Sequence, residues 1–273
     1  MRMSLIDRLF HRQHPAEVPA RIDVAPVEDE VSAAVASVAA GWTIARLEQA
    51  EALWGEGVVW PGGADEFKRL AAPFGLSPAH SLIVLGDGSG GAARVLAADL
   101  GAWVSAYESD RVLIGAAEAW RKRSGAALAK RAMVATWNRR STHFPAKGFH
   151  HALLLDALEP ECVDVVIPGL VQAVKTGGQV VLVQTVADAN EEAAIVAALE
   201  RAGCDLRVVE DETARQSGIV LQAWKQMVRR LRDARPSPVE AAALVQEAAI
   251  WLYRLRRMRE GGLRVLRWGA IVG

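Results

Sequence analysis

The stretch Ser81–Gly91, SLIVLGDGSGG, decides the fold of this protein. Its first five residues, Ser81–Leu85, are mostly apolar and predict a short strand buried in a parallel sheet. Ala92–Leu100, AARVLAADL, predicts a helix of small and aliphatic residues. Between strand and helix lies a turn with four glycines, Gly86, Gly88, Gly90 and Gly91. Because glycines let a ligand and the helix approach the backbone, this order predicts the first half of a nucleotide-binding βαβ unit.

A second strand favours this interpretation over the alternative, a tight turn that binds no ligand. Gly101–Asp110, GAWVSAYESD, predicts the strand, and Glu108 stands near its end, 20 residues after Gly88. A carboxylate at the end of the second strand of such a unit accepts hydrogen bonds from a ribose diol. We therefore expect Glu108 at an exposed strand end, facing a ribose.

The composition is that of an ordinary globular protein. The chain has 273 residues, of which 51% are hydrophobic and 23% charged, and its net charge is zero. No run reaches the roughly 18 apolar residues that cross a membrane, and no secretory signal is visible. Cys162 and Cys204 have no metal-ligand spacing, and the six histidines form no HxxxH or HExxH pattern. We expect a cytoplasmic protein with no metal site and no nucleic-acid partner.

The two ends of the chain differ from its middle. Residues 1–27 predict a flexible arm, with apolar side chains at helical spacing in residues 1–12 that suit weak peripheral contact with a membrane. Residues 28–63 predict a helical lid segment, which includes WGEGVVWPGG at Trp54–Gly63. Lys225–Arg267 carries eleven Lys or Arg against four Asp or Glu. This segment is either the solvated face of two helices or a patch for an anionic partner.

Residues 64–273 predict one α/β domain in which strands and helices alternate, with a helical excursion over residues 212–260. The helix Val163–Lys175 is expected to end at the glycine pair Gly177–Gly178. Thr213 and Gln216 predict a capping box at the start of the excursion. The later strands are expected at Arg131–Thr136, His151–Asp156, Gln179–Val186, Asp205–Glu210 and Leu263–Val272.

From Trp42 to Val272 the pattern resembles the class I S-adenosylmethionine-dependent methyltransferases. In that family a glycine-rich turn follows the first strand, a ribose-binding acid follows the second, and a Lys-Pro-Gly-Gly turn precedes the fifth, here Lys175–Gly178. The resemblance implies a doubly wound, seven-stranded Rossmann-like sheet, mostly parallel, with an antiparallel last strand. It implies S-adenosylmethionine as cofactor, held by Gly86, Asp87, Gly88, Gly90, Glu108, Ser109, Trp137, Asn138 and Asp156.

Three residues depart from the family pattern. Val84 stands where the family has an acid two residues before the first glycine, His150 replaces the Asp of a Phe-Asp pair, and Thr176 replaces the Pro of the later turn. Asp87 is a candidate to replace the missing acid in part. These departures leave open a methyltransferase-like protein that has lost its chemistry.

The lid segment is similar to that of small-molecule N-methyltransferases of the phosphoethanolamine and glycine–sarcosine type. This resemblance implies methyl transfer to a small-molecule acceptor at nitrogen. Trp54 and Trp60 are candidates to stack on a cationic substrate, with core packing as the alternative. His150 and His151 are candidate bases, with a structural role as the alternative.

Two rival functions remain at this stage. Gly86, Gly88 and Gly91 also satisfy the G-x-G-x-x-G pattern of an NAD(P)-dependent oxidoreductase, with Glu108 in the ribose position. A degenerate protein that acts as a binding or assembly factor is the second rival. Equilibrium binding of adenosylmethionine, NADH or neither separates the three.

Overall fold

A computed structural model describes residues 41–232 and 236–273. Seven strands form one sheet in the order β3-β2-β1-β4-β5-β7-β6. Five of them pair in parallel, and β7 runs antiparallel to both β5 and β6. The expected sheet, with its antiparallel last strand, is confirmed. The strands are β1 (Ser81–Leu85), β2 (Trp103–Glu108), β3 (Ala132–Thr136), β4 (Phe149–Leu155), β5 (Val174–Val186), β6 (Cys204–Asp211) and β7 (Arg264–Val272).

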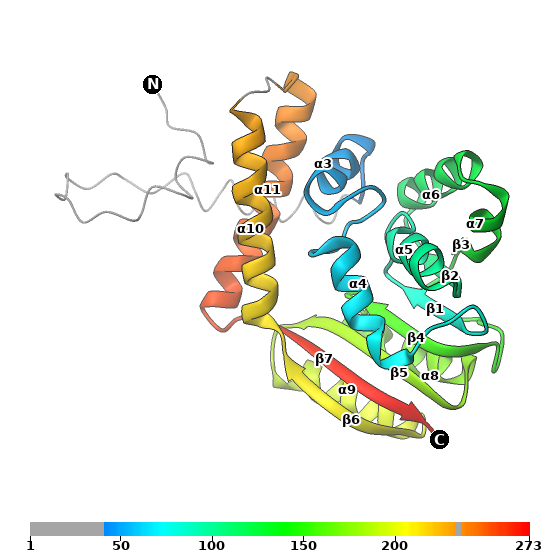
Figure 1. Cartoon of the computed structure of the whole chain (residues 1–273). Coiled ribbons are helices and arrows are strands. Elements are labelled where there is room, and N and C mark those ends of the chain that lie inside the picture. The colour runs from blue at the N-terminus through cyan, green and yellow to red at the C-terminus, as the bar shows by residue number, and fades with distance from the viewer. Residues whose placement is uncertain (1–40, 233–235) are drawn as a thin grey trace.

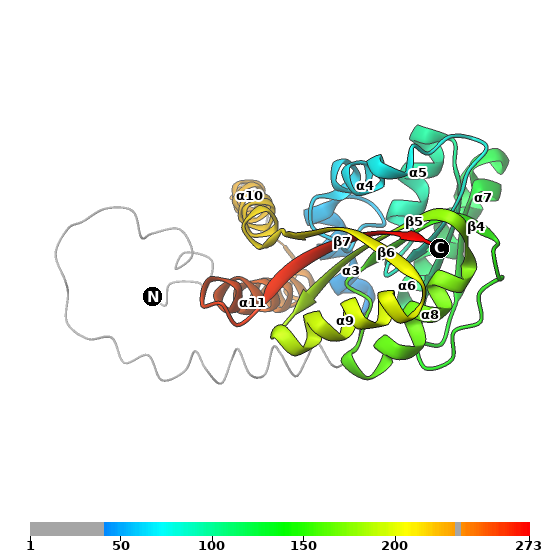
Figure 2. The same ribbon diagram turned by 90° about the horizontal axis from the view of Figure 1, so that it is seen from below.

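Helices cover both faces of the sheet, as Figure 2 shows with α4 and α5 on one side and α8 and α9 on the other. Helix bounds in the described chain are α3 (Ile44–Trp54), α4 (Gly63–Ala71), α5 (Gly91–Leu100), α6 (Arg111–Arg123), α7 (Ala126–Arg131), α8 (Val163–Ala173), α9 (Ala189–Arg201), α10 (Thr213–Leu231) and α11 (Pro238–Arg259). Short 3₁₀ turns stand at Ala72–Phe74 (η1) and Pro160–Cys162 (η2).

The central strand β1 shows why its sequence is apolar without alternation. Leu82 and Val84 belong to the core layer beneath α4 and α5, whereas Ile83 and Leu85 belong to the layer beneath α8 and α9. All four side chains are fully buried. A strand covered by helices on both faces has no position for a polar side chain, so it reads as a continuous apolar run.

The glycine pair Gly177–Gly178 does not end a helix, contrary to the expectation from the sequence. Helix α8 ends at Ala173, and β5 begins at Val174 and runs through both glycines. Val174 is already paired with Phe149 of β4, so the sheet ladder takes over before the glycines are reached. A Cβ at Gly178 would lie 2.2 Å from the carbonyl oxygen of His150, which explains the glycine by close strand contact.

The capping box expected at Thr213 is also wrong. The N-cap of α10 is Glu212, which makes no side-chain capping bond. The hydroxyl of Thr213 instead accepts a hydrogen bond from Val265 N in β7, at 2.9 Å. A true capping box stands at the start of α11, where Ser237 and Glu240 each bond the other's backbone N–H.

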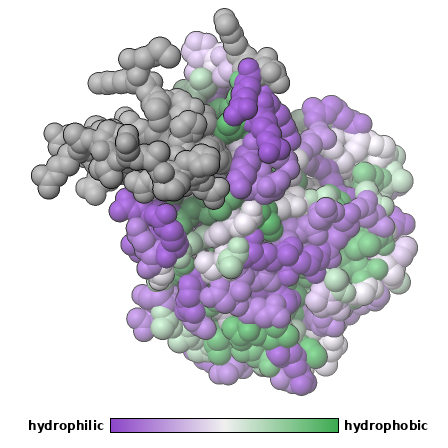
Figure 3. Space-filling model, turned by 60° about the vertical axis from the view of Figure 1, so that its left-hand side comes forward, coloured by the Kyte–Doolittle hydropathy of each residue, from purple (hydrophilic) through white to green (hydrophobic). Residues whose placement is uncertain are grey.

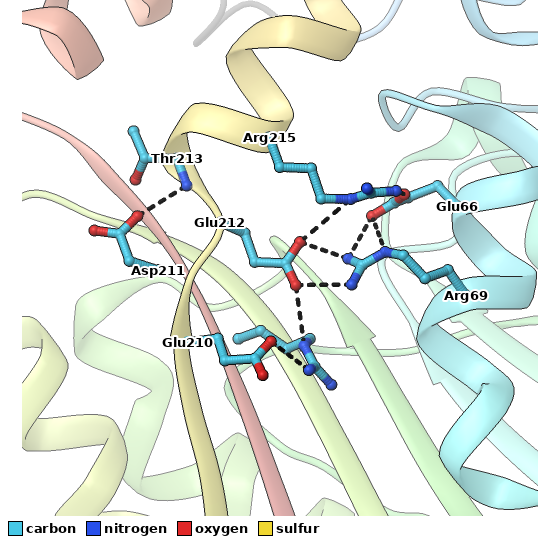
Figure 4. A network of polar contacts seen from close by, with 8 residues as sticks. Glu66, Arg69, Glu210, Asp211, Glu212, Thr213 and Arg215 are labelled. Atoms are coloured by element: carbon cyan, nitrogen blue, oxygen red, sulfur yellow. Dashed lines mark hydrogen bonds and ion pairs between the residues drawn. The ribbon is translucent and has the colours of Figure 1, made fainter.

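An ion network fixes the point where the helical excursion leaves the sheet (Figure 4). Arg69 of α4 lies 2.6 Å from Glu66 and 2.8 Å from Glu212, which links β6 to α10. Arg215 of α10 returns to Glu66 at 2.6 Å, and Arg267 of β7 reaches Glu212 at 3.0 Å. Although burial alone would raise it, the contacts with Arg69 and Arg215 hold the pKa of Glu66 below its usual value.

The predicted domain division is only partly covered by the structure. The arm at residues 1–27, with its candidate membrane contact at residues 1–12, lies outside the described residues, as does the start of the lid segment up to residue 40. Within the described chain, no helix is both long and apolar enough to cross a bilayer. On the face that Figure 3 presents, apolar patches are separated by hydrophilic surface.

The described part of the basic segment Lys225–Arg267 forms the end of α10, all of α11 and the start of β7 (Figure 1). Several of its arginines pair with acids from outside the segment. Arg254 meets Asp156, and Arg264 meets Glu192 at 2.5 Å. Because these arginines are paired within the protein, the contacts favour the interpretation of this segment as ordinary solvated faces over a basic patch open to a partner. Binding of an anionic partner stays a hypothesis.

Candidate functional site

The carboxyl ends of β1, β2 and β4 meet at one edge of the sheet. β1 pairs in parallel with β2 on one side and with β4 on the other, so the direction of winding reverses between β1 and β4. In open α/β sheets, ligands bind outside the carboxyl ends of the strands at this switch point. The glycine turn after Leu85 lies at this edge.

Two glycines of the turn are required by the protein itself. Gly86 has φ +78°, and a Cβ there would lie 2.1 Å from the carbonyl oxygen of Leu155 at the end of β4. Gly88 has φ +71°, and a Cβ there would lie 2.3 Å from a methyl of Val59. Both positions combine a left-handed backbone with a close neighbour, so only glycine fits. Gly90, with φ +89°, is the N-cap of α5.

Asp87 caps helix α5. Its side chain is 2% exposed and accepts hydrogen bonds from Ala92 N at 2.5 Å and Ala93 N at 3.0 Å. Burial raises the pKa of Asp87 to about 7, although both hydrogen bonds and the charge of Arg94 oppose the shift. The carboxylate therefore occupies two of the N–H groups that a helix N-terminus offers to ligands.

The lid loop, residues 55–62, lies directly on the glycine turn. Gly57 N donates to the carboxylate of Glu51 at 2.9 Å, and the guanidinium of Arg94 donates to the carbonyl oxygens of Glu56 and Ser89. Arg94 is 9% exposed and stacks over the ring of Trp120 at 4.7 Å. A buried arginine thus ties α5, the glycine turn and the lid loop together.

Glu108 is buried, not exposed as the sequence suggested. Its side chain is 4% exposed, and Oε1 accepts hydrogen bonds from Ser109 N at 2.7 Å and Asp110 N at 3.1 Å. Burial raises the pKa of Glu108, against the effect of these two bonds and of Arg139. No donor among the described residues reaches Oε2, so one carboxylate oxygen remains available to a ligand.

The residues after β2 and β3 surround Glu108. Ser109 accepts a hydrogen bond from Arg139 Nε at 3.1 Å, and Arg139 continues to Glu159 after β4 at 2.6 Å. Trp137 is 8% exposed and packs in the core layer with the apolar residues of β1. Asn138 is exposed, and its side-chain oxygen accepts from Arg140 N at 2.9 Å within a local turn. The structure thus gathers Ser109, Trp137 and Asn138 at one edge, and their cofactor roles stay predictions.

Asp156 follows β4 in a left-handed conformation, with φ +47°. One carboxylate oxygen accepts from Thr185 N at 2.8 Å, and the other accepts from Arg254 of α11. A non-glycine residue held at positive φ costs free energy, and such residues gather at functional sites. Its position matches the prediction, but both oxygens are engaged by the protein, and its cofactor role remains a prediction.

The two candidate substrate tryptophans lie in the core. Trp54 is 6% exposed and Trp60 is 7% exposed. Trp54 packs edge-on against Trp251 of α11, with ring centroids 5.4 Å apart. The indole N–H of Trp251 donates to Glu247, which also accepts from Arg46 of α3 at 2.9 Å. The Trp54 indole nitrogen is buried with no partner among the described residues, so a role toward a ligand stays open.

His150 and His151 lie at the opposite edge of the sheet. His151 pairs with Leu82 at the start of β1, whereas the glycine turn follows the other end of that strand. His150 accepts a hydrogen bond from Ser81 N at 3.0 Å and lies 2.9 Å from the Lys175 ammonium. Three residues of strand separate the two edges by roughly 10 Å. The interpretation of these histidines as catalytic bases is therefore wrong, because they do not reach the carboxyl edge.

Arg94, Arg139 and Arg254 reach the carboxyl edge but were not among the predicted residues. Arg94 carried a signal, since it is a charged residue among small and aliphatic ones at the start of the helix AARVLAADL, whose other charged residue, Asp99, stands near its end. Arg139 and Arg254 carried none, because nothing local distinguishes an arginine that pairs across the sheet from one on the surface.

Comparison with known proteins shows the fold. No family model and no curated protein matches the sequence. Phosphoethanolamine N-methyltransferase 2 of Haemonchus contortus, solved with S-adenosylhomocysteine and phosphomonomethylethanolamine, is 17% identical and has a TM-score of 0.69. The match covers 83% of this chain and 57% of that one, so this chain spans little more than half of that enzyme.

Two other solved structures limit what the shared fold says about the reaction. The geranyl diphosphate C-methyltransferase of Streptomyces coelicolor is 12% identical, with a TM-score of 0.55 and coverage of 77% of this chain and 79% of that one. The [4+2]-cyclase SpnF is 16% identical, with a TM-score of 0.61 and coverage of 90% and 94%. The chain has the Rossmann-like fold of the class I S-adenosylmethionine-dependent methyltransferases, and a cyclase shares it, so the reaction follows from the site and not from the fold.

Proposed function

We propose that this protein binds S-adenosylmethionine at the carboxyl edge of its sheet and transfers the methyl group to a nitrogen of a small-molecule acceptor. One observation carries the proposal. Buried Glu108, with a free Oε2, ends the strand next to β1 and its glycine turn. Oε2 has no donor among the described residues and keeps some contact with solvent, and two ribose hydroxyls would supply the charge-assisted hydrogen bonds that it lacks.

The residues present fit this cofactor. Glu108 would accept from the ribose, and Ser109 and Asn138 stand beyond the ends of β2 and β3, next to it. When bound, the cofactor supplies a methyl group already activated by the sulfonium charge. The protein's work is then to align an acceptor and to exclude water, and the lid loop at Val59 covers the glycine turn in a way that suits exclusion.

The support for an amine acceptor comes from the lid segment and from a neighbour. The phosphoethanolamine enzyme is named as an N-methyltransferase, and the lid segment of this chain resembles that type. Methyl transfer to a carbon is the alternative, since the geranyl diphosphate enzyme is named as a C-methyltransferase.

The strand order weighs against a nicotinamide-dependent oxidoreductase. The dinucleotide-binding fold has a mostly parallel sheet with the classic order 3-2-1-4-5-6. Here β7 is inserted between β5 and β6 and runs antiparallel to both.

A specific observation keeps the degenerate binding protein as second candidate. Val59 and the carbonyl of Gly57 pack directly on Gly88 and Gly91, so the protein itself occupies the space beside the glycine turn.

Equilibrium binding tests the proposal. The nine tryptophans of the chain make fluorescence quenching a practical readout for adenosylmethionine, adenosylhomocysteine and NADH. We expect saturable binding of the first two and none of NADH, followed by product methylation in a screen of small amines. Saturable binding of NADH, or no binding of either sulfur compound, would refute the cofactor assignment. Cofactor binding without turnover of any amine, phenol or carbon acid would favour the second candidate.

A further inference from the structure

Arg254 stands at the carboxyl edge with unused hydrogen-bonding capacity. It comes from α11, which Figure 1 shows beside the end of the sheet where β7 begins. Because Val186 at the end of β5 pairs with Arg264 at the start of β7, this is the carboxyl end of β5. The helical excursion thus returns an arginine to the edge that holds the glycine turn and Glu108.

The guanidinium of Arg254 is held by one nitrogen. Nη2 donates to Asp156 after β4 and to the hydroxyl of Thr185 in β5, the latter at 2.6 Å. Among the residues that the structure describes, none accepts from Nε or Nη1. The side chain is 24% exposed, so the free nitrogens are accessible, and Trp251 lies 5.1 Å beneath the group.

The surroundings of Arg254 are arranged to hold it in place. Asp156 accepts from Thr185 N with its second oxygen, and its own N–H donates to Val183 O at 2.7 Å, so its left-handed backbone is fixed at both ends. Trp251 is 4% exposed and is itself anchored through its indole N–H on Glu247. An arginine whose partner and stacking surface are both fixed loses little rotamer freedom when it binds a ligand.

The contacts through which Arg254 anchors α11 to the sheet use only its Nη2 nitrogen. A planar guanidinium offers five N–H donors in a fork that matches the oxygens of a carboxylate or a phosphate. The neighbouring buried acid, Glu247, is already neutralised by Arg46 at 2.9 Å, so it does not compete for Arg254. The free edge of Arg254 is therefore a prepared site for a small anion.

We infer that Arg254 is the specificity-determining residue of the acceptor site and that it selects acceptors bearing a carboxylate or a phosphate monoester. Asp156 is its positioning residue, since it orients the guanidinium through Nη2. That the bound molecule is a methyl acceptor rests on the proposed function. The anion site itself rests only on the contacts of Arg254, Asp156 and Thr185.

The test compares matched ligands on protein saturated with adenosylhomocysteine. Glycine is set against glycinamide, and O-phosphoethanolamine against ethanolamine, so that each pair keeps the amine and differs in the anion. We expect the anionic member of at least one pair to bind about tenfold or more tightly, the factor that one lost charge-assisted hydrogen bond implies. The pair that shows the preference identifies carboxylate or phosphate. Equal binding within both pairs would overturn the inference.

Variants assign the preference to a residue. Arg254→Gln should abolish the difference within the pair and leave the dissociation constant of adenosylhomocysteine within about twofold, because the group lies on the acceptor side. Arg259→Gln, an exposed arginine on the same helix, is the control and should keep the preference. If the preference survives in Arg254→Gln, the assignment fails. If that variant does not fold, Arg254→Lys is measured in its place. The lysine ammonium would be shared with Asp156 and Thr185 and has no second pair of N–H donors for the anion. Unchanged anion affinity in Arg254→Lys would therefore overturn the assignment.

A separate arm keeps the two proposals distinguishable. If the parent does not bind adenosylhomocysteine, the proposed function fails, and inorganic phosphate is titrated into the free protein instead. Weaker phosphate binding in Arg254→Gln than in the parent and in Arg259→Gln then supports the anion site on its own. Equal phosphate binding in all three proteins overturns it.

Discussion

Glu108 offers a prediction in which stability and ligand binding move in different directions. Oε1 accepts from Ser109 N and Asp110 N, while Oε2 is left for the ligand. Glu108→Gln keeps an acceptor oxygen for the two backbone N–H groups. Because burial raises the pKa of Glu108, its charged form is already disfavoured in the fold. The neutral amide removes this penalty, so the melting temperature without ligand should stay equal or rise.

Ligand binding should weaken in the same variant. Hydrogen bonds to a charged group contribute about 1.5–3 kcal/mol and those between neutral groups about 0.5–1.5 kcal/mol. The difference of about 1–2 kcal/mol corresponds to a roughly five- to thirtyfold weaker dissociation constant for adenosylhomocysteine. Glu108→Ala removes the acceptor altogether and should lose about ten- to a hundredfold.

Glu108→Ala also orphans the N–H groups of Ser109 and Asp110, which are partly buried. This costs about 1 kcal/mol, or about 2–4 °C in melting temperature for a domain of this size. Isothermal titration calorimetry and thermal unfolding measure the two effects separately. If both variants bind adenosylhomocysteine as tightly as the parent, Glu108 is a buried structural acid and the cofactor assignment loses its second anchor.

Three further predictions concern the glycine turn, the far edge and the core. Gly88→Ala should destabilise the protein by at least about 1 kcal/mol in urea unfolding, and Val59→Ala should recover part of this because its methyl lies 2.3 Å from the new Cβ; a purely additive double variant would contradict this contact. Burial, with the charges of His80 and His150, lowers the pKa of His151 to about 4 from 6.5, so the unfolded chain binds the proton more readily and stability falls as pH drops from 6.5 to 4. The free energy of unfolding should be about 2 kcal/mol lower at pH 5 than at pH 7.5. The variant His151→Asn keeps an acceptor for the backbone and should not show this pH-dependent decrease. Glu247→Gln should cost about 3 kcal/mol, because it removes the counter-charge of the buried Arg46 guanidinium and leaves one oxygen for the two donors of Arg46 and Trp251. A Met–Met replacement of the Arg46–Glu247 pair should cost less, and the opposite order in urea unfolding would refute the reasoning.

The features set by neighbours along the chain could be predicted from the sequence. The strand Ser81–Leu85, the glycine turn and the helix after it depend on local composition, because four glycines in six residues permit little else. The spacing from the glycine turn to Glu108 follows from the length of one helix and one turn, so it could also be predicted from the sequence. The last strand, expected at Leu263–Val272, was confirmed as β7 at Arg264–Val272.

What surrounds these elements was decided by contacts between distant segments. The sequence alone placed Glu108 on the surface, but the loops after β2 and β3 bury it. It assigned Gly177–Gly178 to a helix end, whereas pairing with β4 drew them into a strand. Ladder bonds and burial outweigh local preference where the two compete.

The functional edge itself is a product of the tertiary structure. Arg254 reaches Asp156 across 98 residues of sequence, and Arg94 reaches the lid loop across 38. His150 and His151 suggested a base by residue type, and only the strand register showed that they lie at the wrong edge. Residue type and spacing name the chemistry that a chain carries, but which groups meet depends on strand order, since parallel pairing brings together ends that lie far apart in sequence.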